Sequence, residues 1–260
     1  MKKILAILFS FLFLFSFSIT VFAQSPNGIP EKNGDYQDPD HPGLRVRVFV
    51  HSPKPSKPES TQSPSLVCPT PDPDSNAVVP PAGWKLPSTW TYTLNPSSVP
   101  SSVGSANLAA ITNNAFTQWT NVLGGKVTIS KTSSNTRTDR ARYDRQNIIA
   151  WGRTSASALA VTYTWYYTSG SLAGQAAEED TIFNKKYPWF WNSLNFACTD
   201  SNSYDAQDIL THEIGHWFGL NDTYDEVFID NTMYGYGLKG ETKKDTLTTG
   251  DTLGVWAIYP

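Results

Sequence analysis

The stretch that most restricts the fold of this chain is THEIGHWFGLND, residues 211–222, in which two histidines stand four positions apart. Apolar residues at helical spacing predict a helix over about 204–218, and residues four apart on a helix lie one turn apart on one face. His212 and His216 can therefore reach one Zn²⁺ ion at about 2.0–2.1 Å. Glu213 is rotated by about 100° from His212, which places it to hold a water on the metal instead of ligating in line.

A catalytic zinc ion usually has three protein ligands and one open position, so the sequence must supply a third ligand. The other two histidines, His41 and His51, lie in a proline-rich stretch, so we expect the folded domain to have no further histidine for the metal. Gly219 can adopt the left-handed conformation that ends a helix and turns the chain back. Asp222 is then the predicted third ligand, because carboxylate oxygen is a normal zinc ligand.

Alternatives remain open at this stretch. Asp222 could be only a polar residue of the turn after the helix, and in that case Asp225 or Glu226 would be the substitute ligand. The two histidines could also be incidental residues of a solvated helix. The glycine and the aspartate in register with the histidine pair favour a metal site.

The first 23 residues read MKKILAILFSFLFLFSFSITVFA, with two lysines, an apolar run and small residues at the end. This pattern predicts a signal peptide, residues 1–23, cleaved before Gln24. The alternative is an uncleaved membrane anchor, since the run is long enough to span a bilayer. We expect a secreted, extracellular protein with no stable membrane insertion after cleavage. The net charge of −3, without a basic stripe, argues against a nucleic-acid partner.

Proline distribution divides the rest of the chain. Thirteen of the 18 prolines lie between Gln24 and Pro81. Such a stretch cannot bury much apolar surface, so we expect residues 24–82 to be extended or disordered, as a removable pro-segment or a linker. Residues 45–50 are an exception, because they alternate like a short strand.

Residues 83–260 read as one α+β domain in which helices and strands are mixed along the chain. The predicted helices lie at about 104–123, 204–218 and 249–257. The predicted strands lie at 90–94, 127–129, 147–151, 158–168 and 180–183.

The motif HEIGHWFGLND resembles the extended zinc motif of the metzincin metallopeptidases, HExxHxxGxxH/D, in the aspartate variant seen in the snapalysins. Metzincins also have a methionine turn beneath the metal. The segment NTMYGY, residues 231–236, matches this turn, with Met233 eleven residues after Asp222. The Met-Tyr pair and the order of elements over 90–260 are most similar to matrixin-like bacterial proteins.

This resemblance implies a metzincin-like fold: a mixed, mostly parallel twisted sheet with an antiparallel edge strand, a long active-site helix, the Met-turn and a C-terminal helix. It implies a secreted zinc endopeptidase, made as a zymogen and expected to be monomeric, that cleaves protein or peptide substrates. His212, His216 and Asp222 would hold catalytic Zn²⁺, Glu213 would be the general base, and Met233 would be a packing support. The alternatives are a secreted non-catalytic binding module or adhesin on the same scaffold, and a protein with a structural zinc.

The only two cysteines, Cys68 and Cys198, suggest one disulfide in an oxidising compartment. In matrixins a pro-segment cysteine can instead occupy the open zinc position and keep the enzyme latent. The usual sequence around such a cysteine is Pro-Arg-Cys-Gly, whereas this chain has Leu-Val-Cys-Pro. The disulfide is therefore our prediction, with the latency role and two free thiols as the alternatives.

Three further segments have open interpretations. The acidic run 178–180 could bind Ca²⁺ or be an exposed acidic cluster. The aromatic run 189–191 could line a substrate cleft or pack in the core. Residues 239–246 read as a solvated loop, and Tyr236 reads as part of the scaffold.

Overall fold

The computed structural model describes the chain in five stretches: residues 28–55, 66–67, 72–155, 157–191 and 198–260. The predicted signal peptide, residues 1–23, lies outside the described residues. Within them, no helix combines the length and the apolar character that crossing a membrane would require.

The main sheet has the strand order β1-β2-β7-β8-β6-β4-β5. Strands β8, β6, β4 and β5 run parallel to one another, and β7 runs antiparallel to β8. This part is the mostly parallel sheet with an antiparallel edge strand that the metzincin resemblance implies. The strands are β1 Gly34–Gln37, β2 Leu44–Pro53, β4 Thr89–Leu94, β5 Thr128–Lys131, β6 Ile148–Gly152, β7 Ala160–Tyr167 and β8 Ala176–Asn184.

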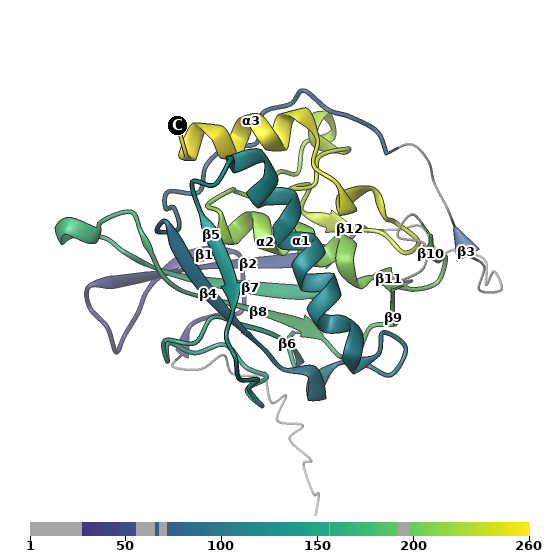
Figure 1. Cartoon of the computed structure of the whole chain (residues 1–260), viewed down its shortest axis with the longest axis horizontal. Coiled ribbons are helices and arrows are strands. Elements are labelled where there is room, and N and C mark those ends of the chain that lie inside the picture. The colour runs from purple at the N-terminus through teal and green to yellow at the C-terminus, as the bar shows by residue number, and fades with distance from the viewer. Residues whose placement is uncertain (1–27, 56–65, 68–71, 156, 192–197) are drawn as a thin grey trace, which may run out of the picture.

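Three α-helices accompany the sheet: α1 Leu108–Leu123, α2 Ala206–Trp217 and α3 Thr249–Ile258. All three were predicted, and α1 begins later than expected because a short 3₁₀ turn precedes it, η3 Ser105–Asn107. Gly124 ends α1 in the left-handed conformation, with φ 58°. Figure 1 shows α1 lying across the sheet, with α2 beside it and α3 at one end.

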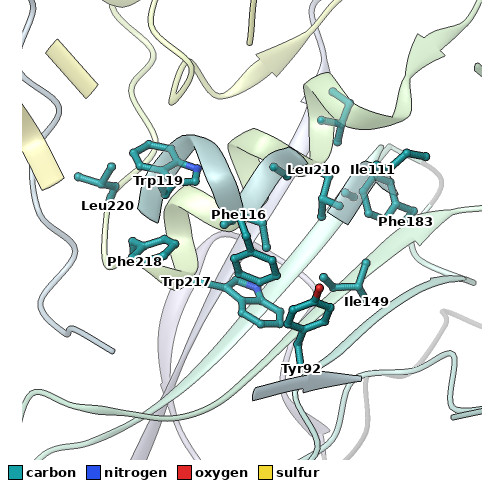
Figure 2. Packing of buried hydrophobic residues seen from close by; sticks show 14 of the residues in the cluster. Tyr92, Ile111, Phe116, Trp119, Ile149, Phe183, Leu210, Trp217, Phe218 and Leu220 are labelled. Atoms are coloured by element: carbon teal, nitrogen blue, oxygen red, sulfur yellow. The ribbon is translucent and has the colours of Figure 1, made fainter. Parts of the chain in front are cut away.

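The core holds α2 against both the sheet and α1. Phe116 of α1 stacks on Tyr92 of β4 at 4.7 Å between ring centroids and meets Trp217 of α2 edge-on at 5.5 Å, as Figure 2 shows. The indole of Trp119 donates a hydrogen bond of 2.9 Å to the carbonyl of Thr211. These contacts fix the long helix of the HExxH motif from its far side.

Part of the proline-rich stretch belongs to the sheet, and the expectation that it buries little apolar surface was wrong. Strand β2 pairs antiparallel with β7 over eight residue pairs, and β1 pairs antiparallel with β2. Val46, Val48, Phe49 and His51 are each at most 1% exposed. Because β7 offers an open edge, a short alternating run can bury both of its faces there, whatever the average composition around it.

Chain 72–82 also packs against the rest of the molecule. Val79 is fully buried, and its N–H donates 3.2 Å to the carbonyl of Gly250. The backbone N–H of Ala82 donates 2.7 Å to the carbonyl of Gly219. Ordered structure therefore begins before residue 83. The start of the catalytic domain at residue 83 stays a prediction.

Short strands join the remaining loops. β3 Leu66–Val67 pairs with β10 Thr199–Asp200, β9 Trp189–Phe190 pairs with β11 Tyr204–Asp205, and β12 Tyr236–Gly237 pairs with β2. Within the aromatic run 189–191, Trp189 and Trp191 are buried in the core, as the packing interpretation predicts. Cys198 is disulfide-bonded. Its predicted partner, Cys68, lies outside the described residues.

The acidic run in β8 is buried, so its interpretation as an exposed cluster was wrong. Asp180 accepts hydrogen bonds from the backbone N–H groups of Arg142 at 2.9 Å and Ile148 at 3.0 Å. Glu178 accepts the N–H of Asp144 at 2.9 Å. These carboxylates fasten the loop before β6 to the sheet, and nothing among the described residues supports a calcium site here.

The segment 239–246 is not a solvated loop throughout, which corrects another expectation. Lys244 is fully buried in a 3₁₀ turn, η6 Lys243–Asp245. Its ammonium group donates to the carbonyls of Tyr234 at 2.9 Å and Tyr236 at 2.8 Å. A buried lysine is tolerated where its donors are satisfied, and these two carbonyls belong to the chain that follows the metal motif.

Burial raises the pKa of Glu178 from an ordinary 4.5 to about 8. The folded carboxyl therefore keeps a proton that the unfolded chain loses, and this contribution to stability fades as the pH rises from about 4.5 towards 8. We expect Glu178→Gln, which cannot ionise, to gain thermal stability relative to the unaltered chain as the pH is raised. Each kcal/mol corresponds to about 2–4 °C in Tm.

The measurement is a series of thermal melts from pH 5 to pH 8.5. Glu226→Gln, at an exposed position, is the matched control and should give parallel Tm curves. Parallel curves for Glu178→Gln as well would contradict the expected titration.

Candidate metal centre and active site

The helix that carries the metal motif is capped and buried throughout. Asp205 is its N-cap, and its carboxylate accepts the backbone N–H groups of Gln207 at 2.8 Å and Asp208 at 3.1 Å. Every residue of α2 is buried, including His212 and His216. The helix therefore presents its side chains to a site formed entirely inside the protein.

The two histidines and the predicted third ligand come together. The Nε2 atoms of His212 and His216 lie 3.2 Å apart. Oδ1 of Asp222 lies 3.2 Å from Nε2 of His212 and 3.4 Å from Nε2 of His216. Zinc bonds of about 2.0–2.1 Å at tetrahedral angles would separate ligand atoms by about 3.3–3.4 Å. The three atoms thus fit three corners of a zinc tetrahedron.

A hydrogen bond from Nδ1 fixes each imidazole in the tautomer that can bind a metal through Nε2. Nδ1 of His212 donates to the carbonyl of Thr232 at 2.8 Å, and Nδ1 of His216 donates to the carbonyl of Leu220 at 2.9 Å. A proton on Nδ1 leaves the Nε2 lone pair free for a metal. Burial also lowers the pKa of His212 to about 4, so this imidazole is neutral at physiological pH. Oδ1 of Asp222 has no hydrogen-bond donor in the described part of the chain.

The turn after α2 brings Asp222 back to the histidines. Gly219 has φ +90°, the left-handed conformation that the sequence predicts. A Cβ atom at this position would lie 2.1 Å from the carbonyl oxygen of Trp84, so only glycine fits. Asp225 and Glu226, the substitute ligands considered from the sequence, are exposed and lie outside this group.

Tyr224 orients the carboxylate ligand, and no motif in the sequence predicted this role. Its hydroxyl donates to Oδ2 of Asp222 at 3.0 Å, which leaves Oδ1 turned towards the histidines. The side-chain amide of Asn33 donates to the same hydroxyl at 2.8 Å. Such partners of a ligand tune metal affinity, because they hold the ligand in one orientation.

Met233 lies beneath the histidine helix. It is fully buried, and a Cβ atom on Gly215 would meet its sulfur at 2.2 Å. Asp251, in the first turn of α3, accepts the backbone N–H groups of Thr232 at 2.9 Å and Met233 at 3.3 Å. Asp251 of α3 therefore holds the methionine turn in place. The Thr232 carbonyl of this turn accepts the hydrogen bond from Nδ1 of His212.

One carboxylate oxygen of Glu213 is fixed by a hydrogen bond, and the other is available to accept a proton. Its Oε2 accepts the hydroxyl of Thr162 at 2.6 Å, and Thr162 lies 2.7 Å from the hydroxyl of Thr181. The indole of Trp217, which can only donate, is bonded to Thr181 at 3.0 Å. The Oε1 atom of Glu213 has no hydrogen-bond partner among the described residues. Burial raises the pKa of Glu213 to about 7.

His51 reaches the site, so the expectation that no further histidine belongs to the folded domain was wrong. Its Nδ1 lies 3.6 Å from Oε1 of Glu213, and its ring meets that of His212 edge-on at 4.0 Å. Phe49, two residues earlier in β2, stacks on His216 with 3.7 Å between ring centroids. His41 lies away from the site and contacts Asp38 at 3.1 Å.

A comparison with protein families gives a match to the matrixin model (peptidase M10) over residues 83–260. The match covers more than half of the chain. This chain belongs to the matrixin family. A comparison with curated proteins found no match. Membership supports zinc metallopeptidase activity with peptide substrates. For this matrixin, the assignment of an aspartate as the third ligand comes from the distances of Asp222 to the two histidines, described above.

Replacing Tyr224 by phenylalanine removes the hydrogen bond to Oδ2 of Asp222. We expect the Kd for zinc of the full chain to rise about 10-fold, because the carboxylate loses its orientation. Competition with a chromogenic chelator measures this. Tyr236→Phe is the matched control, since Tyr236 packs on the Tyr224 ring at 5.2 Å and should leave the Kd within about two-fold. Equal zinc affinities for the two variants would contradict the orienting role.

Proposed function

We propose that this matrixin is a secreted zinc-dependent endopeptidase in which His212, His216 and Asp222 hold the metal. The observation that carries this proposal is the set of three ligand atoms 3.2–3.4 Å apart, beside Oε1 of Glu213, which has no hydrogen-bond partner among the described residues. Zinc held there would polarise the scissile carbonyl and acidify a water molecule.

Glu213 is the proposed general base. Because Thr162 holds Oε2, the carboxylate keeps Oε1 directed to the site and needs no reorientation to accept a proton from the attacking water. The same carboxyl group would take that proton and return it to the leaving amine. A structural zinc site would need no such base, and this argues against that alternative.

The substrate is proposed to be a protein chain in extended form along β7. Backbone pairing with a strand edge is largely independent of side chains, which suits an endopeptidase of broad range. Thr162 lies on this strand and bonds Glu213, so the edge and the base are directly connected. Secretion is supported by the sequence of residues 1–23 and by the disulfide of Cys198, since disulfides persist in oxidising compartments.

A non-catalytic binding module remains the second candidate, and one observation favours it. Strand β2 lies across the site, with His51 beside Glu213 and Phe49 on His216. If that arrangement were permanent, no substrate could reach the metal. Turnover therefore separates the two candidates.

We expect Glu213→Gln to keep one equivalent of zinc. Its rate of casein hydrolysis should fall about 10²–10⁴-fold, because the base is gone while the ligands remain. Zinc is measured by elemental analysis of the purified full chain. Hydrolysis is measured in the unaltered background and in a Val48→Asp background, in which a charge at the fully buried position 48 should displace β2.

His216→Ala should lose both zinc and hydrolysis, and Glu226→Gln should lose neither. A hydroxamate should inhibit, since it needs an open metal position. Zinc-loaded chain that fails to cleave in both backgrounds would reject the peptidase and favour the binding module.

A further inference from the structure

The imidazole of His51 occupies a closed space beside the metal centre. Its Nδ1 lies 3.6 Å from Oε1 of Glu213, and its ring meets that of His212 edge-on at 4.0 Å. The His51 side chain is fully buried. The space that it fills therefore begins at the proposed base and at a metal ligand, where a substrate side chain next to the scissile bond would lie.

The walls of this space are apolar and close to the imidazole. A Cβ atom at Gly237 would lie 2.7 Å from Cδ1 of Leu159 and 2.9 Å from Cδ1 of Ile209. It would also lie 3.1 Å from Nε2 of His51. Leu159 and Ile209 are at most 1% exposed. We call the space that these three residues enclose together with Lys244 the His51 pocket.

The ammonium group of Lys244 closes the end of the His51 pocket. It donates to the carbonyls of Tyr234 at 2.9 Å and Tyr236 at 2.8 Å. A lysine ammonium has three donors and no acceptor, so its contact of 3.4 Å with Nε2 of His51 uses the third donor. Oε2 of Glu241 lies 3.8 Å away, which is too far for a hydrogen bond. The pocket therefore has apolar walls and one buried donor at its end.

A substrate strand would bring one side chain into this pocket. An extended chain paired with β7, as proposed above, would take the register of β2, in which His51 lies opposite Ala160. Side chains alternate between the faces of a strand, so the residue opposite Ala160 points to the metal centre. In glutamate and glutamine the terminal oxygen stands as many bonds from Cα as Nε2 does in histidine. Either side chain can therefore reach Lys244 and accept the hydrogen bond that His51 accepts.

We propose that the His51 pocket selects the substrate, and that it takes a side chain flanking the scissile bond that ends in an acceptor oxygen, glutamate or glutamine. The inference rests on the proposed peptidase function and names its substrate class. An apolar side chain of similar length would bury the Lys244 donor without a partner, and a lysine would place a second cation beside it.

Peptide cleavage tests this selection. Matched peptides carry glutamate, glutamine, methionine or lysine at the positions that flank the cleaved bond. They are offered to the zinc-loaded full chain in the two backgrounds used for casein. We expect kcat/KM for the glutamate and glutamine peptides to exceed that for the methionine peptide about 10–100-fold, as expected for a hydrogen bond to a charged group. The lysine peptide should be the slowest.

Lys244→Met should abolish this preference. The readout is a ratio of two substrates on one enzyme sample, so it does not depend on the fraction of the variant that is folded. Lys243→Met is the matched control and should keep the preference. It makes the same change one residue earlier, where the ammonium group donates to the Ile229 carbonyl and to Asp230 instead of the pocket.

A second measurement needs neither turnover nor a Lys244 variant. His51→Gly empties the pocket of the zinc-loaded full chain, and small molecules that match a side chain from Cβ outward can refill it. We expect 4-methylimidazole, propionate and propionamide to raise the Tm and butylamine to leave it unchanged. Propionamide carries no charge, so its effect separates the acceptor oxygen from attraction to zinc. The unaltered chain, whose pocket is filled, should respond to none of them.

The outcomes separate the pocket from the peptidase. Cleavage that prefers methionine, or a glutamate preference that survives Lys244→Met, would overturn the inference while leaving the peptidase intact. Equal stabilisation of His51→Gly by propionamide and butylamine, or by neither, would overturn it as well. A chain that cleaves nothing in either background but gives the expected Tm pattern would support the acceptor pocket and reject the peptidase function. Faster cleavage after glutamate than after glutamine would identify the preferred acceptor as a carboxylate.

Discussion

The site depends on the two hydrogen bonds that His212 and His216 donate from Nδ1 to the carbonyls of Thr232 and Leu220. Each bond selects the tautomer that presents Nε2 to a metal, and each ties the helix to a different turn that follows it. The turn at Gly219 supplies Leu220 and returns Asp222, while the methionine turn supplies Thr232. One helix and two turns therefore fix all three ligand atoms. A substitution that distorts either turn would leave at least one ligand wrongly oriented.

Much of this arrangement could be predicted from local sequence. The helices and central strands have strong periodicity, and Gly219 predicts the turn that returns Asp222, because both signals act over a few residues. The positions of β2, Lys244 and Tyr224 could not be predicted in this way. The partners of β2 lie far along the chain, as with His51 of β2 and Glu213 of α2. The hydrogen bonds from Lys244 to the two tyrosine carbonyls and from Tyr224 to Asp222 span at most ten positions, but hydrophobic periodicity does not identify such polar contacts. The alternation of residues 45–50 does predict a short strand, but it does not predict the full length of β2 or its pairing with β7.

Buried polar groups connect the metal site to the strand that covers it. Lys244 donates to the carbonyls of Tyr234 and Tyr236, and its ammonium nitrogen lies 3.4 Å from Nε2 of His51. Strand β12, which contains Tyr236, pairs with the end of β2. The loop after the methionine turn therefore contacts β2 directly, so the β1–β2 hairpin is held at its end by the same segment that supports the metal ligands.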